Sequence, residues 1–209
     1  MANQILYIAI AIIFAYLLGS VPSAYIAGRL RKGIDIRDVG SRNVGAMNVF
    51  YKVGFVTGLV VLAADIGKGA AAVAFAHWLG VPMIAELFAG VAVIIGHGFP
   101  VFLKLRGGRG GATCIGVLIY LMPWGIPIYL AIFGLGLLIT RYATLSYSVA
   151  FICFPFVAWL IYHSGALIIF SIAILLIPGI KYIPRIKEMR AKGGSWRRVA
   201  MRKDLKDRL

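Results

Sequence analysis

The sequence predicts an all-α integral membrane protein with about seven transmembrane helices, some of them short. Of the 209 residues, 61% are hydrophobic, and the mean hydropathy is +0.92, which is more apolar surface than one soluble core of this size needs. The cations are also banded: Lys68 is the only one inside the apolar blocks, and eleven of the 22 Lys and Arg residues follow Ile180. Such banding follows the positive-inside rule. We therefore interpret the net charge of +15 as a sign of membrane topology and of attraction to anionic lipid, and not of nucleic-acid binding.

Seven apolar segments follow one another along the chain. They cover residues 5–27, 53–79, 83–103, 113–122, 125–139, 145–162 and 166–180. The first is interrupted by a polar turn at 19–23, and it lacks a basic start and a cleavage site, so we expect a retained helix and not a signal peptide. The fourth would extend only about 15 Å as a helix, against a hydrocarbon core of about 30 Å. Either the loop before it dips into the membrane, or the fourth and fifth segments form a shallow hairpin.

An odd number of crossings predicts termini on opposite faces, with the N-terminus outside and the basic C-terminus cytoplasmic. The polar loops 29–52, 104–111 and 141–146 would then share the cytoplasmic face, whereas the opposite loops contain no Lys or Arg. We expect one transmembrane domain over residues 1–180. Residues 181–209 would form a basic cytoplasmic tail, either solvated or lying on anionic lipid as an interfacial helix.

The stretch 96–113 is the most polar interruption of the apolar chain. It contains His97, six glycines, a threonine and the cations Lys104, Arg106 and Arg109. Glycine can take positive φ, which lets successive backbone N–H groups point at one anion, and the apolar run that follows predicts a helix N-terminus, where phosphate is also favoured. The Gly-Lys-Ser/Thr ending of a Walker motif is missing. The stretch indicates either a phosphate-binding loop or a flexible basic loop that only orients the protein.

A second glycine-rich turn, 40–48, contains a hydroxyl and two carboxamides, with Arg42 as its one cation. These groups suit hydrogen bonds to a phosphoryl or carbonyl oxygen, although the turn could also be a capped loop that leads into the next helix. In the second apolar segment, Asp65 and Lys68 lie at i and i+3 on one helix face. They predict either a functional site or a mutually neutralising pair that holds the helix. Cys114 and Cys153 both fall in apolar segments and suggest neither a disulfide nor a metal site.

Several of these polar residues belong to motifs that occur in a fixed order over about residues 10–150. They are Gly19-Ser20-Val21-Pro22, Gly33-Ile34-Asp35-Ile36-Arg37, Val39-Gly40-Ser41-Arg42-Asn43-Val44-Gly45-Ala46-Met47-Asn48, Asp65-Ile66-Gly67-Lys68-Gly69, Gly96-His97-Gly98-Phe99-Pro100-Val101-Phe102 with Gly107-Gly108-Arg109-Gly110-Gly111-Ala112-Thr113, and Arg141-Tyr142-Ala143-Thr144-Leu145-Ser146. In this order they resemble the bacterial membrane family that transfers an acyl group from acyl phosphate to glycerol 3-phosphate. The resemblance implies a seven-helix protein of the bacterial inner membrane, with a cytoplasmic active site that makes lysophosphatidic acid and phosphate for phospholipid biosynthesis. It implies no metal and no organic cofactor, and it implies a partner enzyme that supplies acyl phosphate.

The resemblance also assigns site residues. Ser41, Asn43 and Arg109 would be catalytic. Substrate binding would fall to Asn48, Lys104, Gly107, Gly108, Gly110, Thr113, Thr144 and Ser146. The glycine loop would hold one phosphate, and the 40–48 turn would hold the other substrate. Small hydroxyls near a helix start, such as those of Thr144 and Ser146, are also typical of helix caps. No residue stands out as general base; His97 beside Phe99-Pro100 is either a candidate base or a structural residue, and the substrate's own phosphate could accept the proton.

The chain departs from the family pattern at several of these positions. Arg42 replaces a Gly, Met47 a Thr, Arg109 a Lys and Gly111 a Val, and the family's His and Asn after the last helix have no counterpart in 180–187. Arg109 keeps the charge of Lys but changes its shape and reach. Two other functions stay open: a non-catalytic or acceptor-switched paralogue that binds phosphorylated lipid precursors, and a small lipid or solute transporter. A transporter would not need its polar loops on one face.

Overall fold

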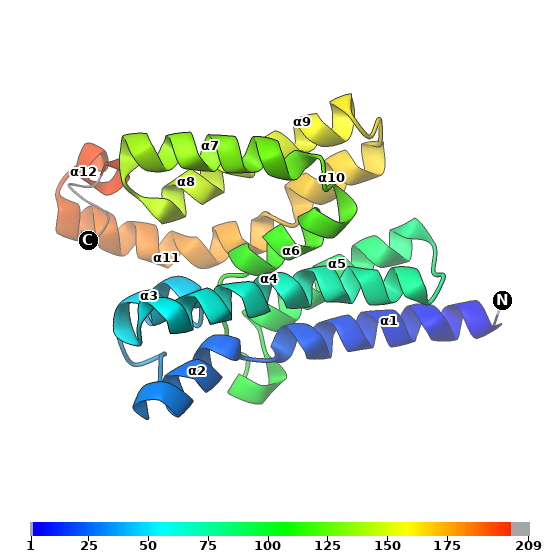
Figure 1. Cartoon of the computed structure of the whole chain (residues 1–209), viewed down its shortest axis with the longest axis horizontal. Coiled ribbons are helices and arrows are strands. Elements are labelled where there is room, and N and C mark those ends of the chain that lie inside the picture. Colours follow the sequence, from blue (N-terminus) through cyan, green and yellow to red (C-terminus); the bar gives the residue numbers. More distant parts are fainter. Residues whose placement is uncertain (1, 202–209) are drawn as a thin grey trace. The chain divides into compact units, whose positions relative to one another are not determined.

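The computed structural model describes residues 2–201, and every regular element in that range is a helix. In chain order these are α1 Ala2–Ser20, α2 Ser23–Lys32, α3 Ala46–Lys52, α4 Phe55–Trp78, α5 Met83–Gly98, the 3₁₀ helix η1 Val101–Leu103, α6 Gly111–Leu121, α7 Gly125–Thr140, α8 Ala143–Ala150, α9 Cys153–Leu160, α10 Gly165–Ala173, α11 Leu176–Gly193 and α12 Trp196–Ala200. Figure 1 shows their arrangement. The predicted all-α class is confirmed.

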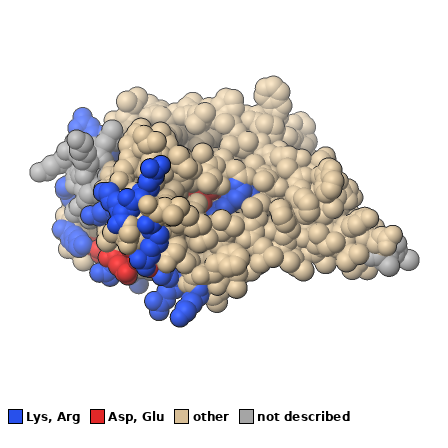
Figure 2. All heavy atoms as spheres, turned by 60° about the horizontal axis from the view of Figure 1, so that its bottom comes forward, with Lys and Arg blue, Asp and Glu red and all other residues tan. Residues whose placement is uncertain are grey.

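Five helical stretches are long and apolar enough to cross a membrane. They are Asn3–Lys32, Phe55–Trp78, Met83–Leu103, Ala143–Leu160 and Gly165–Gly193. Helices α6 and α7 are apolar but shorter. Figure 2 shows a surface that is largely uncharged, with the Lys and Arg side chains gathered in clusters, as the banded sequence predicts. Each of the seven predicted apolar segments therefore corresponds to helix, and five of them are full-length candidates for a crossing.

The chain divides into two compact units, Met1–Leu121 and Met122–Leu209. In the first unit α5 packs against both α1 and α4, and α4 also packs against α6 (Figure 1). Two of these contacts are so close that only glycine fits. A Cβ on Gly96 of α5 would overlap the Tyr16 carbonyl oxygen of α1, and a Cβ on Gly116 of α6 would overlap the Ile66 carbonyl oxygen of α4. Small residues allow membrane helices to approach in this way.

The polar turn at 19–23 breaks the first apolar segment, as predicted. Helix α1 ends at Ser20, and α2 begins at Ser23 directly after Pro22, which is the N-cap residue and has no N–H to continue the hydrogen bonding of α1. Helix α5 ends similarly before Pro100, and the chain turns through η1 into residues Lys104 and Leu105, both with positive φ. These two interruptions bring non-helical backbone next to the buried polar side chains described below.

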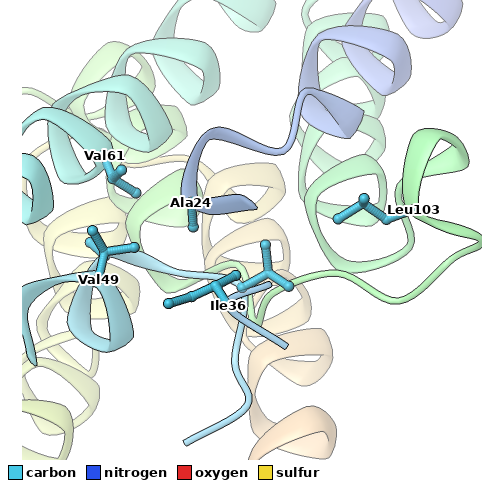
Figure 3. Close-up of a cluster of buried hydrophobic side chains, with 7 residues drawn as sticks. Ala24, Ile36, Val49, Val61 and Leu103 are labelled. Carbon is cyan, nitrogen blue, oxygen red and sulfur yellow. The ribbon is translucent and has the colours of Figure 1, made fainter. Parts of the chain in front are cut away.

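A small apolar cluster lies beneath the loop that joins α2 to α3. Its buried members include Ala24 of α2, Ile36 of the loop, Val49 of α3, Val61 of α4 and Leu103 of η1 (Figure 3). Because η1 directly precedes the glycine loop, the start of that loop and the 33–45 loop pack on the same apolar cluster.

In the second unit α7 packs on α8 and α9, α9 on α10, and α11 on α12. The predicted segment 145–162 is two helices, because the chain turns between Ala150 and Cys153. Helix α11 continues through Ile180 to Gly193 and contains Pro184. The predicted basic tail therefore begins inside α11, where the sequence changes from apolar to basic without a break in the helix. The rest of the predicted tail, residues 202–209, lies outside the described part of the chain.

Candidate active site

The glycine loop runs from Lys104 to the first residue of α6. Gly110 has positive φ, +90°, and its carbonyl oxygen accepts the Cys114 N–H at 2.8 Å, which opens α6. The loop therefore leads into a helix N-terminus, as predicted, where the first N–H groups have no acceptor within the helix and are available to an anion. Of the three cations, Arg109 is half-buried, whereas Lys104 and Arg106 are exposed.

Gly107 and Gly108 are glycines for a different reason from the predicted one. Neither has positive φ, so the expectation that this run needs glycine for its backbone angles is wrong at these two positions. A Cβ on Gly107 would overlap the His97 carbonyl oxygen, and a Cβ on Gly108 would overlap both His97 Nε2 and the Val44 carbonyl oxygen. The Gly108 N–H also donates to the His97 carbonyl oxygen at 3.1 Å. Close packing, and not dihedral freedom, requires glycine here.

The position of Gly108 brings the two predicted substrate loops together. Val44 belongs to the 40–48 turn, and His97 belongs to the last turn of α5. Because Gly108 is in contact with both, the glycine loop and the 40–48 turn meet at this residue. Ser41 and Asn43 of that turn are half-buried.

Asn48 holds the 40–48 turn in shape. Its side chain is 3% exposed, and its Oδ1 accepts the Ser41 N–H at 3.1 Å. Its Nδ2 lies 3.0 Å from the carbonyl oxygens of Ile36 and Val39 and 3.1 Å from that of Asn43. The two N–H groups of the amide are thus shared among three carbonyl oxygens, and the side chain is fully committed to the loop backbone.

Asp35 anchors the preceding turn, a role that the sequence reasoning missed. Its carboxylate accepts hydrogen bonds from the Arg37 side chain at 2.7 and 3.0 Å and from the Arg37 N–H at 3.0 Å. These bonds, with the positive charges of Arg37 and Arg29, lower the pKa of Asp35 to about 2. The Arg37 guanidinium also lies over the Tyr25 ring of α2, which ties the turn to that helix. An Asp two residues before an Arg in a glycine-flanked turn was the available signal.

A buried polar cluster lies where α4, α5 and the α1–α2 break meet. Asp65 and Lys68 form the predicted ion pair, with 2.9 Å between Nζ and Oδ1. Asp65 Oδ1 also accepts the Ser23 hydroxyl at 2.6 Å and lies 3.6 Å from His97 Nδ1. Lys68 donates to the Val21 carbonyl oxygen at 3.1 Å. A small polar cavity of about 10 Å³, room for about one water molecule, borders this cluster and is lined by Lys68, His97 and residues 19–23.

Thr113 and Ser20 each carry a fully buried hydroxyl with no hydrogen-bond partner among the described residues. Thr113 lies in the first turn of α6, where its carbonyl oxygen is pressed against Gly69 of α4. Ser20 lines the polar cavity. A hydroxyl without a partner in a buried place costs free energy, so these positions are suited to an ordered water.

The third predicted loop belongs to the second unit. Ser146 is 1% exposed, and its hydroxyl donates to the Tyr142 carbonyl oxygen at 3.0 Å and lies 3.0 Å from Thr140 Oγ1. Thr144 is half-buried, and its carbonyl oxygen accepts the Ser148 hydroxyl at 2.7 Å. The Ser146 hydroxyl thus stabilises the turn that opens α8. Within residues 2–201, no three His, Cys, Asp or Glu side chains gather as they would around a metal ion.

Comparison with known proteins gives consistent results. Residues 9–192 match the family model described as glycerol-3-phosphate acyltransferase. A relative from Dehalococcoides mccartyi, glycerol-3-phosphate acyltransferase 2, is 53% identical over 99% of this chain and 100% of its own length. A glycerol-3-phosphate acyltransferase from Bacillus subtilis is 46% identical over 66% of this chain and 72% of its own.

Two crystal structures of PlsY, an integral membrane glycerol 3-phosphate acyltransferase, resemble this fold. The glycerol 3-phosphate form has a TM-score of 0.81 at 30% identity, and the lysophosphatidic acid form has a TM-score of 0.78 at 28% identity. Both matches cover 88% of this chain and 92% of the other.

Proposed function

We propose how this chain, a member of the glycerol-3-phosphate acyltransferase family that transfers an acyl group to glycerol 3-phosphate in phospholipid synthesis, carries out the transfer. The donor is an acyl phosphate. Loops of the first unit bind the phosphates of the two substrates. The observation that carries the proposal is the contact at Gly108. It joins a glycine loop at a helix N-terminus to a polar turn, and so gives two binding segments for two phosphorylated substrates.

The proposed reaction needs no covalent enzyme intermediate. An acyl phosphate is a mixed anhydride, so the acyl carbon is already activated and phosphate is a good leaving group. The 1-hydroxyl oxygen of glycerol 3-phosphate bonds to the acyl carbon, the bond from that carbon to the phosphate oxygen breaks, and the hydroxyl proton passes to the departing phosphate. The products are 1-acylglycerol 3-phosphate and phosphate. The protein has to align the reactants and stabilise the negative charge.

The residues of the first unit divide this work. The N–H groups around Gly110 and the first turn of α6, with Arg109 beside them, would bind one phosphate. Ser41 and Asn43 would contact the other substrate, and Asn48 would act through the turn it holds. In the second unit the Ser146 hydroxyl, also predicted to bind substrate, is engaged within its own turn.

The finer topology and location are part of the same proposal. We place the N-terminus outside a bacterial inner membrane and the active loops and basic C-terminal segment on the cytoplasmic side. The support is that residues 79–82, 123–124 and 163–164 contain no Lys or Arg, whereas the site loops are basic. Anionic lipid headgroups and an enzyme that supplies acyl phosphate would be the partners.

The test is phosphate release from acyl phosphate by the purified protein, with and without glycerol 3-phosphate. We expect release to depend on the acceptor. Arg109→Ala should lower kcat/KM by about 10²- to 10³-fold, as loss of a strong charge-stabilising group does elsewhere. Lys192→Ala is the matched control, because it removes an exposed cation of α11 that pairs with Glu188.

Two results would count against the proposal. Transfer from an acyl-CoA thioester but not from acyl phosphate would replace the proposed donor. A folded protein without acceptor-dependent release would favour the paralogue that binds phosphorylated lipid precursors.

A further inference from the structure

His97 contacts the glycine loop with both its main chain and its side chain. Its carbonyl oxygen accepts the Gly108 N–H at 3.1 Å, and its ring nitrogen Nε2 occupies the space that a Cβ on Gly108 would need. The ring is 7% exposed and is fixed at the end of α5. The imidazole and the Val44 carbonyl oxygen therefore both lie against Gly108 where a Cβ would point.

The other side of the His97 ring faces the buried cluster. Nδ1 lies 3.6 Å from Asp65 Oδ1, and Asp65 is 1% exposed. The same oxygen accepts the Ser23 hydroxyl and pairs with Lys68, which in turn donates to the Val21 carbonyl oxygen. One carboxylate thus connects the α1–α2 break, α4 and the ring that touches the glycine loop.

Such a cluster is a costly way to hold helices together. Burying an ion pair costs several kcal/mol of desolvation per ion, and well-packed apolar residues often stabilise a fold equally well. The neighbouring α4–α6 contact shows that this chain also joins helices by close approach at glycines, at Gly69 and Gly116. The cluster therefore suits a role that packing cannot fill, namely holding one ring in one orientation.

We propose that His97 is a positioning residue of the acyltransferase: Asp65 and Lys68 orient its imidazole, and the imidazole holds Gly108 and hence the phosphate-binding N–H groups that follow. The inference rests on the proposed function of the glycine loop. It gives Asp65 and Lys68 an indirect role in substrate binding, through the ring of His97.

The decisive variant is His97→Asn. The Asn amide can take the place of Nδ1 opposite Asp65, but it is too short to reach Gly108. If His97 only satisfies Asp65, His97→Asn will behave like the wild type. If His97 positions the loop, the variant will keep the Tm of the wild type while the KM for one phosphorylated substrate rises by about tenfold or more. His97→Ala should lower Tm and raise that KM together.

His77→Ala is the control. His77 also pairs with a carboxylate, Glu86, at 2.8 Å. This pair joins the last turn of α4 to the first turn of α5, whereas His97 lies in the last turn of α5. His77→Ala should leave both KM values unchanged.

Hydrogen exchange of the 107–113 amides gives a readout that does not depend on turnover. We expect exchange to be about tenfold faster in His97→Asn, with α4 unchanged. If exchange is faster in His97→Asn but the wild-type protein shows no acceptor-dependent release, the proposed function is refuted and the inference stands. Wild-type KM values and exchange in His97→Asn would overturn the inference alone. A His97→Asn protein that does not fold would also overturn it, because the ring would then serve the fold.

Discussion

At the scale of single residues, the site is built from side chains that hold backbone. The Asn48 amide donates to backbone carbonyl oxygens of its loop, and neighbouring atoms leave no space for a side chain at position 108. The sequence analysis could select both residues, because small and carboxamide residues in glycine-rich turns are typical of ligand loops. It could not separate contact with substrate from contact with the loop, because that difference depends on residues 11 or 12 positions away: Ile36 for Asn48, and His97 for Gly108.

Asn48→Ala should destabilise the protein by about 2–3 kcal/mol, because it leaves a buried N–H and buried carbonyl oxygens without partners. The measurement is the unfolding midpoint in detergent. Asn48→Asp is nearly the same size but keeps only the acceptor, and it faces three carbonyl oxygens, so it should not recover the loss. Wild-type stability in Asn48→Asp would show that the donor bonds are unimportant.

Asp35 predicts a pH dependence of stability. Its pKa of about 2 in the folded protein lies below the value of about 3.9 in an unfolded chain, so the carboxylate stabilises the fold above about pH 4. The full shift corresponds to about 2.6 kcal/mol, which solvent screening near the surface reduces to about 1–2 kcal/mol, and most of this contribution is lost as the pH falls from about 5 to 2. The difference in unfolding free energy between wild type and Asp35→Asn should therefore be largest at pH 5–6 and vanish near pH 2. Asp38→Asn, an exposed neighbour, is the control, and a difference that persists at pH 2 would contradict the assignment.

At the scale of elements, the helices were predictable and some of their ends were not. The apolar runs and the proline turn at 19–23 placed α1, α2, α4, α5, α6 and α7. The turn between α8 and α9 carries neither a Gly nor a Pro at 151–152, but Pro155 in the first turn of α9 was an available signal, because its missing N–H breaks a continuous helix there. Helix α11 runs past Ile180 because a basic composition does not end a helix, and Lys and Arg have high helix propensity.

The α4–α6 contact should tolerate no side chain at Gly116. Gly116→Ala places a methyl group against the Ile66 carbonyl oxygen, and such overpacking costs about 1–3 kcal/mol. Gly134→Ala, inside α7, meets no atom within 4 Å and should be neutral or slightly stabilising. The two variants are compared by their unfolding midpoints, and equal midpoints would exclude close packing as the reason for Gly116.

At the scale of the whole molecule, composition and charge banding predicted a helical membrane protein, and the fold confirms that class. The sequence did not predict two compact units, because their boundary at Leu121 and Met122 lies in a short break between two apolar segments and has no polar linker. Of the three polar loops that it predicted on one face, the first two belong to the first unit and the third to the second.

The proposed topology can be tested with reporters fused after Gly80, Lys104 and Gly194. A reporter active only outside the cytoplasm should work after Gly80 alone, and a cytoplasmic reporter should work after the other two, because the basic loops stay inside. Activity of both kinds of reporter after Lys104 would favour a loop that dips into the membrane. The reverse pattern would overturn the proposed orientation.

The confinement of Gly108 also limits how this enzyme can change. One obstacle to a larger residue there is a side chain, His97, which a second mutation could shorten. The other is the main-chain oxygen of Val44, which is present whatever residue occupies position 44. In a relative without the histidine, the Val44 carbonyl oxygen would still exclude a side chain at position 108. The two substrate loops therefore cannot change independently at their point of contact. Random libraries selected for growth should therefore return glycine at 108 even when position 97 is free to vary.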